Sequence, residues 1–137
     1  MENNNKTNSH QILALLLLKK AKEDLLWANA SHKDKFFAGC CFVCQQAAEK
    51  ALKAFLFSKE QTLIKTHLLP RLLKECLKFD EQFEELKDAC EVLTLYYTES
   101  RYPSDADDSE FNTNEKSKEA LTLLQDILNF IEIKLKY

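Results

Sequence analysis

Apolar residues recur at helical spacing through the middle of the chain, over residues 36–57. The positions that repeat every three or four residues there are Phe36, Cys40, Val43, Cys44, Ala47, Ala51 and Phe55. A stripe of this period is typical of a helix that packs one side against a core. Three further apolar residues, Ala48, Leu52 and Leu56, widen the stripe. We therefore predict a helix over residues 34–58 that is buried on more than one side, with the rest of the chain folded around it.

Helical periodicity continues on both sides of this segment. The other predicted helices cover residues 10–31, 66–79, 81–100 and 112–136. The chain has one glycine and two prolines, and such a scarcity of turn residues argues against many short strands. Pro70 is expected in the first turn of its helix, and Asp80 is expected to cap the next one. Asn112 and Glu115 resemble a capping box for the last helix. The predicted fold class is all-α, an antiparallel up-and-down bundle of about five helices.

The first nine residues differ from the rest because they are polar and show no periodicity. We expect residues 1–9 to be a disordered tail and residues 10–137 to form a single domain, since the chain is too short for two cores. The apolar run at residues 12–18 is far shorter than the roughly 20 residues of a membrane span, and no signal peptide is recognisable. The net charge of −3 gives no strong indication of a nucleic-acid partner. A cytoplasmic protein without membrane contact is expected.

Five cysteines suit a buried, reduced core better than disulfides or a metal site. Cys40, Cys41 and Cys44 lie close together on one predicted helix, which rules out a disulfide framework among them. Cys41 and Cys44 have the CxxC spacing of a metal site, but no second such pair follows. Free cysteine is among the most often buried residue types. We therefore expect core cysteines, no bound metal and no cofactor.

Polar residues gather in segments that a bundle would bring together. Lys50 and Lys53 lie late in the second predicted helix, and His67 lies at the start of the third. In an up-and-down bundle these helix ends and the end of the fourth helix share one end of the molecule. We therefore predict that Lys53, His67 and Arg101 lie within one surface region. The alternatives are a solvated lysine face, a histidine that caps a helix or packs under the loop, and an arginine paired with Asp105 or with helix carbonyls.

Three motifs, in this order and spacing, resemble the HEPN family (higher eukaryotes and prokaryotes nucleotide-binding). They are QQAAEKALKAFL from Gln45, KTHLLPRLL from Lys65 and YYTESRYPSD from Tyr96, followed by a last amphipathic helix. The likeness covers about residues 21–135. It implies an antiparallel helical bundle, often dimeric, in a prokaryotic protein often encoded beside a small nucleotidyltransferase. In some cases such a pair forms a toxin–antitoxin system.

The resemblance also bears on catalysis. Many HEPN proteins are metal-independent RNases that use an arginine followed four to six residues later by a histidine. Arg101 matches the arginine, but positions 105–107 hold Asp, Ala and Asp. A histidine there would help to move the 2′-hydroxyl proton or to stabilise the leaving group, whereas an aspartate would repel the phosphate. RNase activity is therefore not expected unless His67 replaces the missing histidine.

The leading hypothesis is a non-catalytic or weakly catalytic HEPN protein that binds a nucleotide or RNA ligand, or a nucleotidyltransferase partner. The candidate ligand-binding residues are Lys50, Lys53, His67, Arg101, Tyr102 and Asp105. Arg101 and Lys53 would neutralise phosphate. Tyr102 would stack on a base, and His67 would donate a hydrogen bond. The alternatives are an RNase toxin that acts through Arg101 and His67, and a helical interaction module without catalysis.

The first predicted helix is apolar around too much of its circumference for a small monomer to cover. Leu15, Leu16 and Leu17 point in directions that span about 200° at 3.6 residues per turn, whereas a bundle buries a stripe of roughly 100°. At least one of them is expected to face outward, and a large exposed apolar patch usually marks an interface. We therefore predict a homodimer, which the family resemblance also implies.

Overall fold

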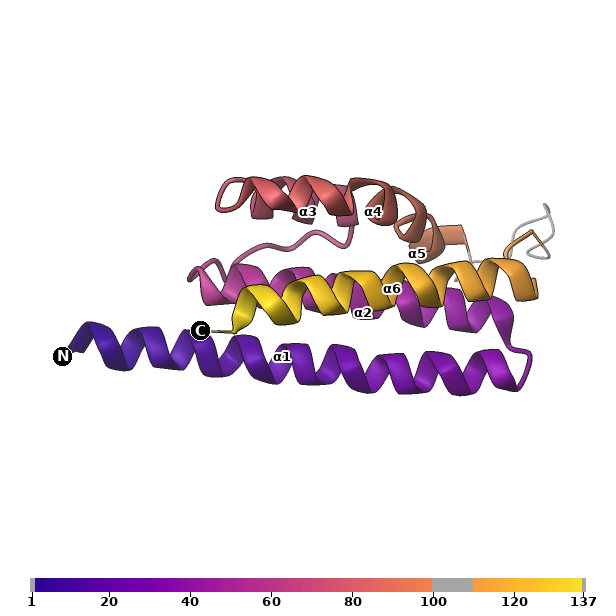
Figure 1. Cartoon of the computed structure of the whole chain (residues 1–137), viewed down its shortest axis with the longest axis horizontal. Helices are drawn as coiled ribbons and strands as arrows, with labels where there is room; N and C mark the ends of the chain where they lie inside the picture. Colours follow the sequence, from indigo (N-terminus) through magenta and orange to yellow (C-terminus); the bar gives the residue numbers. More distant parts are fainter. Residues whose placement is uncertain (1, 100–109, 137) are drawn as a thin grey trace.

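The computed structural model describes the backbone of residues 2–99 and 110–136 and the side chains of residues 9–97 and 110–136. The regular elements in these ranges are the helices α1 Glu2–Lys33, α2 Phe37–Ser58, α3 Leu69–Leu77, the 3₁₀ helix η1 Glu81–Leu86, α4 Lys87–Leu93, α5 Leu95–Glu99 and α6 Asn114–Leu135. They form layers, with α1 along one face and α3 and α4 along the opposite face (Figure 1). The predicted all-helical bundle is confirmed.

Helix α2 lies at the centre of the bundle and packs against α1, α3 and α6. Its buried residues are Cys40, Cys41, Val43, Cys44, Gln45, Ala47, Ala48, Glu49, Ala51, Leu52, Ala54, Phe55 and Leu56. The prediction that this helix is buried on more than one side is therefore confirmed. It begins at Phe37 rather than at residue 34, because Lys35 adopts a left-handed φ of 66° in the turn that follows α1.

Helix α1 is longer than predicted, since it begins at Glu2 rather than near His10. Residues 2–9, which we expected to be a disordered tail, contain neither glycine nor proline and continue the helix. The first turns of α1 extend past the ends of α2 and α6 (Figure 1). The polar composition of this segment fits its position, because a helix outside the bundle has no core to pack against.

The largest departure from the prediction is the direction of α3. Glu60 has a left-handed φ of 62°, and the chain then returns along α2 in a non-helical connection. Gln45 Nε2 donates to the carbonyl oxygen of His67 at 3.1 Å, and Cys76 Sγ donates to that of Leu52 at 3.8 Å. Helix α3 therefore runs in the same direction as α2, whereas an up-and-down bundle would reverse it.

The fourth predicted helix is divided into η1, α4 and α5. Asp80 caps it as predicted, since Oδ1 accepts from the backbone N–H of Gln82 at 2.9 Å. Pro70 lies in the first turn of α3, also as predicted. The helix is interrupted at Thr94, whose Oγ1 accepts from the backbone N–H of Leu69 at 3.1 Å. This contact joins the start of α3 to the end of α4, so these two helices are antiparallel neighbours.

Helix α6 starts beside the start of α2. Thr113 caps it, because Thr113 Oγ1 accepts from the backbone N–H of Lys116 at 3.2 Å. Asn112 Oδ1 instead accepts from the backbone N–H of Ala38 at 3.1 Å. The capping box predicted for Asn112 and Glu115 was therefore wrong, since the asparagine links α6 to the first turn of α2.

The cysteines lie in the core, as predicted. Cys40, Cys41, Cys44, Cys76 and Cys90 are all free and buried. Burial raises the pKa of Cys41 and that of Cys90 to about 12, so both thiols stay protonated at neutral pH. Within the described ranges, no group of three or more His, Cys, Asp or Glu residues is arranged to hold a metal ion. In the same ranges, no helix combines the length and apolar composition that crossing a membrane requires.

Candidate functional site

A buried carboxylate on α2 lies at the centre of a polar cluster. Glu49 is 8% exposed, and each of its carboxylate oxygens accepts from Nδ1 of His67 at 3.1 Å. Its Oε2 also accepts from Nζ of Lys53 at 2.9 Å, one turn further along α2. Burying a charge is costly unless it is paired and hydrogen-bonded, and here both partners are present. Glu49, Lys53 and His67 are called the Glu49 cluster below.

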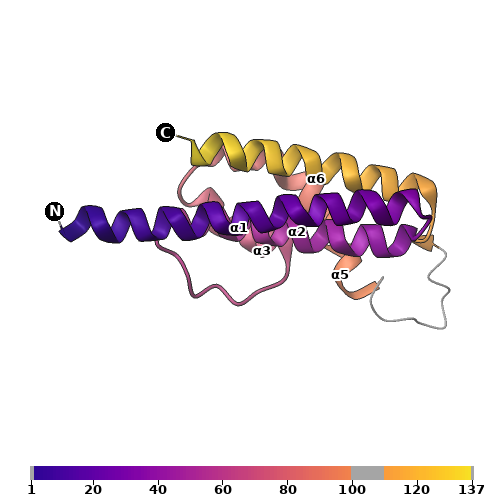
Figure 2. The ribbon, with the colours of Figure 1, turned by 90° about the horizontal axis from the view of Figure 1, so that it is seen from below.

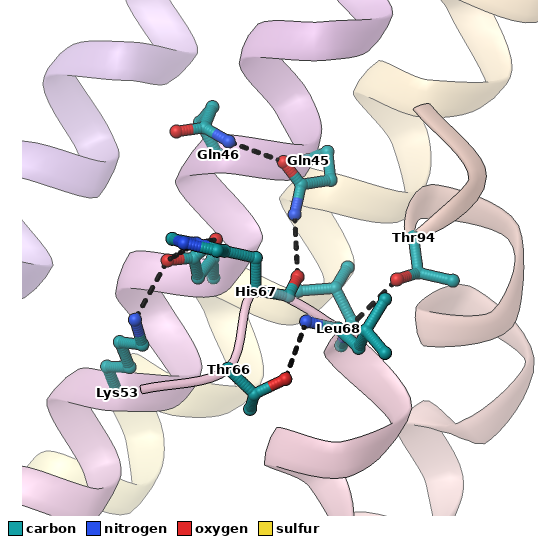
Figure 3. A network of polar contacts seen from close by, with 9 residues as sticks. Gln45, Gln46, Lys53, Thr66, His67, Leu68 and Thr94 are labelled. Carbon is teal, nitrogen blue, oxygen red and sulfur yellow. Dashed lines mark hydrogen bonds and ion pairs between the residues drawn. The ribbon is translucent and has the colours of Figure 1, made fainter. Parts of the chain in front are cut away.

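His67 is held in place by contacts on several sides. Gln45, fully buried on α2, donates from Nε2 to the His67 carbonyl oxygen, and Gln46 Nε2 donates to Gln45 Oε1 at 2.6 Å (Figure 3). The imidazole ring stacks on Tyr97, with ring centroids 5.0 Å apart and ring planes 13° apart. Because its backbone, its Nδ1 and one ring face are all engaged, His67 is positioned jointly by α2 and α5.

The contact with Glu49 determines which nitrogen of His67 carries the hydrogen. An ionised carboxylate can only accept, so Nδ1 donates to Glu49, and Nε2 of the neutral ring remains an acceptor. The side chain of His67 is 52% exposed, whereas that of Glu49 is 11% exposed. The cluster therefore presents an oriented imidazole at the surface, able to hydrogen-bond a ligand or to take a proton from one.

Two of the predicted site residues lie together. Lys53 and His67 belong to the same cluster through their shared partner Glu49. Lys50 points toward α1 instead, where its Nζ pairs with Oδ2 of Asp24 at 2.6 Å. It borders a groove of about 420 Å³ between α1 and α2. The two lysines therefore lie in different surroundings, although they are three residues apart on one helix.

Three of the predicted site residues, Arg101, Tyr102 and Asp105, lie outside the described residues. The shared surface predicted for Lys53, His67 and Arg101 therefore holds for the lysine and the histidine and remains a prediction for the arginine.

The predicted gathering of these segments at one bundle end was wrong. Helix α2 ends at Ser58, whereas α6 starts beside Ala38, at the other end of α2. His67 lies between these ends, beside Glu49, because the non-helical connection carries it back along α2. Its second neighbour, Tyr97, precedes Arg101 by four residues in the chain. Tyr97, from the motif that starts at Tyr96, thus contacts His67, from the motif that starts at Lys65.

Glu49, Gln45 and Tyr97 were not predicted as site residues. Glu49 precedes Lys53 by one helical turn, the spacing at which Glu and Lys stabilise each other, and this signal could have indicated the pair. Gln45 gives no such signal, since its partner is a backbone carbonyl 22 residues away. Tyr97 lies next to the buried Tyr96, and the sequence does not indicate which of the two contacts His67.

Comparison with known proteins assigns the chain to a family. The family model described as HEPN domain matches residues 14–134. The chain therefore belongs to the HEPN domain family, as its motifs implied.

Solved structures agree with this assignment. The chain is similar to TT1696 from Thermus thermophilus, with 32% sequence identity, a TM-score of 0.79, and coverage of 88% of this chain and 97% of that one. It is also similar to ST0689, described as an archaeal HEPN homologue, with 25% identity, a TM-score of 0.73, and coverage of 90% and 98%. No curated protein shows a significant match.

Proposed function

We propose that this HEPN protein binds a nucleotide at the Glu49 cluster. The observation that carries the proposal is the state of His67, an exposed imidazole that a buried carboxylate orients and a tyrosine stacks against. Buried charged groups are costly, and they concentrate at functional sites.

The chemistry of the cluster suits a nucleotide. Lys53, whose side chain is 20% exposed, supplies a positive charge beside the imidazole of His67. We assign to Lys53 the contact with a phosphate group, and to Nε2 of His67, an acceptor, a hydrogen bond from a hydroxyl group of the ribose. Arg101, four residues after Tyr97 in the chain, would supply a second charge for phosphate, and Tyr102 would stack on the base.

Calorimetric titration with ATP tests this proposal. The variant His67→Gln should weaken binding roughly two- to tenfold, since a hydrogen bond between uncharged groups is worth about 0.5–1.5 kcal/mol. His10→Gln is the matched control, because His10 also faces a carboxylate, that of Glu60 at 3.5 Å, but lies outside the cluster. Binding by the wild type that only His67→Gln weakens supports the proposal. No heat of binding, or equal weakening by both variants, contradicts it.

The same surface is proposed to meet a partner nucleotidyltransferase, within a prokaryotic pair of the toxin–antitoxin type. Membership of the HEPN family and the similarity to a Thermus thermophilus protein and an archaeal HEPN homologue support this part of the proposal. Co-expression with the product of the adjacent gene tests it. Co-elution that the variant Lys53→Glu abolishes, and Lys118→Glu on α6 leaves intact, is the expected result. Separate elution of the two wild-type proteins contradicts it.

A second candidate function, RNA cleavage, is favoured by one observation. The Nδ1 atom of His67 donates to Glu49, so Nε2 carries no hydrogen and is able to accept the proton of a 2′-hydroxyl group. We rank it second because no histidine follows Arg101 at the spacing of the RNase motif. Purified protein is therefore expected to leave single-stranded RNA intact. Cleavage that both Arg101→Ala and His67→Gln abolish would replace nucleotide binding as the function.

We also propose that the protein is a homodimer. Ile12, Leu13, Leu15 and Leu16 on α1 are about half exposed, as predicted from the apolar circumference of this helix. Exposed apolar surface of this kind usually marks an interface. Light scattering at micromolar concentration should give twice the mass of one 15.9 kDa chain. The mass of a single chain that persists on concentrating the sample contradicts the dimer.

A further inference from the structure

Helix α1 carries a second stripe on the side turned away from the bundle. It lies across one face of the molecule, in front of α2 when seen from that side (Figure 2). The residues of this outer stripe are Ile12, Leu16, Lys19, Glu23, Leu26 and Ala30, all of them exposed. Their spacing of four, three, four, three and four residues is the heptad pattern by which one helix packs against another. The inner stripe of the same helix holds Ala14, Leu18, Ala21 and Ala28, which are buried in the core.

We propose that the outer stripe of α1 packs against α1 of a second copy of this chain, antiparallel and centred on residue 21. The inference rests on the proposed homodimer and specifies its interface. In this register Leu16 lies opposite Leu26 of the partner subunit, and Lys19 lies opposite Glu23 of the partner subunit. The two-fold axis repeats each pair, so the interface is closed.

Charge decides the direction of the pairing. A parallel pair of α1 helices would place Lys19 opposite its own copy and Glu23 opposite its own copy, and like charges at an interface cost several kcal/mol. The antiparallel register replaces both repulsions with two opposite-charge pairs. Neither residue makes an ion pair within the described part of the chain, and the order Lys before Glu gives the weaker pairing within one helix. Both side chains therefore remain available to a partner.

The apolar surface on this face has the extent of a dimer contact. Leu26 is 71% exposed and Trp27 is 64% exposed. Leu13, Leu15 and Leu16 on the same helix are about half exposed. Together these side chains offer on the order of 600 Å² per chain, near the roughly 800 Å² per partner of a standard interface. Grooves of about 420 Å³ and 410 Å³ flank α1, one beside Trp27 and one beside Leu26. They give room for the partner's side chains on both sides of the seam.

The proposed interface leaves the Glu49 cluster open. Helix α3 and the connection that carries His67 do not lie on the α1 face (Figure 1). Each chain of the dimer would therefore keep a site of its own.

Charge reversal on the exposed stripe tests the pairing. Lys19→Glu or Glu23→Lys alone should raise the dissociation constant of the dimer by at least about tenfold, and the double reversal should restore it. Lys118→Glu, an exposed reversal on α6, is the matched control and should change nothing. The chain has one tryptophan, so a blue shift of Trp27 emission with rising concentration reports burial of this face. An unshifted emission across a measured dimerisation would place the interface elsewhere.

Disulfide formation tests the register. The variant carrying both Leu16→Cys and Leu26→Cys should oxidise to a covalent dimer, whereas either single variant should not. In this register two copies of residue 16 lie about 15 Å apart along the helix axis, far beyond the reach of a disulfide. The native cysteines are buried, and the wild type controls for them. A covalent dimer from a single variant overturns the register while leaving the homodimer standing. A monomeric wild type by light scattering overturns both.

Discussion

The substitution Glu49→Ala tests whether the buried carboxylate organises the site. It removes the group to which both Lys53 and His67 donate, at 2.9 Å and 3.1 Å. The Lys53 ammonium and the His67 imidazole would then lose their shared acceptor, and the imidazole would lose the contact that sets its orientation.

The size of the effect follows from the burial of the three side chains. Each charge-assisted hydrogen bond is worth roughly 1.5–3 kcal/mol when its partners are desolvated. Lys53 and His67 are 20% and 52% exposed, so both can turn to water after the change. We therefore expect a net loss of only about 1–2 kcal/mol in the free energy of unfolding, or roughly 3–8 °C in Tm for a chain of this length.

Thermal unfolding followed by circular dichroism measures this loss. Glu119→Ala is the matched control, since Glu119 is exposed on α6 and should change Tm by less than about 2 °C. A coupling energy between Glu49→Ala and His67→Ala, from the double-mutant cycle, isolates the pair itself. Equal Tm values for Glu49→Ala and the wild type, with no coupling to His67→Ala, would refute the structural role given to Glu49.

Three further predictions concern stability. Gly39→Ala should stabilise the protein by up to about 1 kcal/mol, because the nearest atom to an added Cβ is 3.9 Å away; a lower urea midpoint would contradict this. The raised pKa values of Cys41 and Cys90 stabilise the fold fully below the ordinary thiol pKa of about 8.5 and progressively less above it, so the urea midpoint should fall from about pH 8 to pH 10. A flat profile would show that these thiols are not protonated in the core. The hydrogen bond from Lys134 lowers the pKa of Asp80, and the stability it gives is lost as pH falls below about 4. Asp80→Asn should therefore flatten the acid limb of the stability profile, and an unchanged limb would count against the pair.

The helices were predictable because the spacing of apolar residues along the chain indicates which side of a helix is buried. The central helix, the proline in the first turn of α3 and the cap at Asp80 are local features, and each was found where the sequence indicated. The direction of α3 was not predictable in this way. It depends on the left-handed turn at Glu60 and on contacts such as that between Cys76 and Leu52, which lie far apart in the sequence.

The candidate site was predictable only in part, because some of its contacts also join residues that lie far apart in the sequence. Lys53 and His67 were predicted as site residues from their side chains, an ammonium group and an imidazole, and they do lie together. Their common partner Glu49 is a polar residue at the edge of an apolar stripe, where a solvated position was equally expected. The contacts of Gln45 and Tyr97 with His67 depend on how the connection returns along α2. They could therefore be identified only from the structure.

The most direct test of the Glu49 cluster as a binding site is the NMR spectrum of the histidine rings during titration with ATP. The chain has three histidines, His10, His32 and His67, so each ring can be followed separately. His32 is engaged with Ser117 and His10 with Glu60, and both act as internal controls. We expect the signals of His67 alone to shift and to saturate with ATP. Signals that stay unchanged at millimolar ATP, or that shift alike for all three rings, would contradict nucleotide binding at the Glu49 cluster.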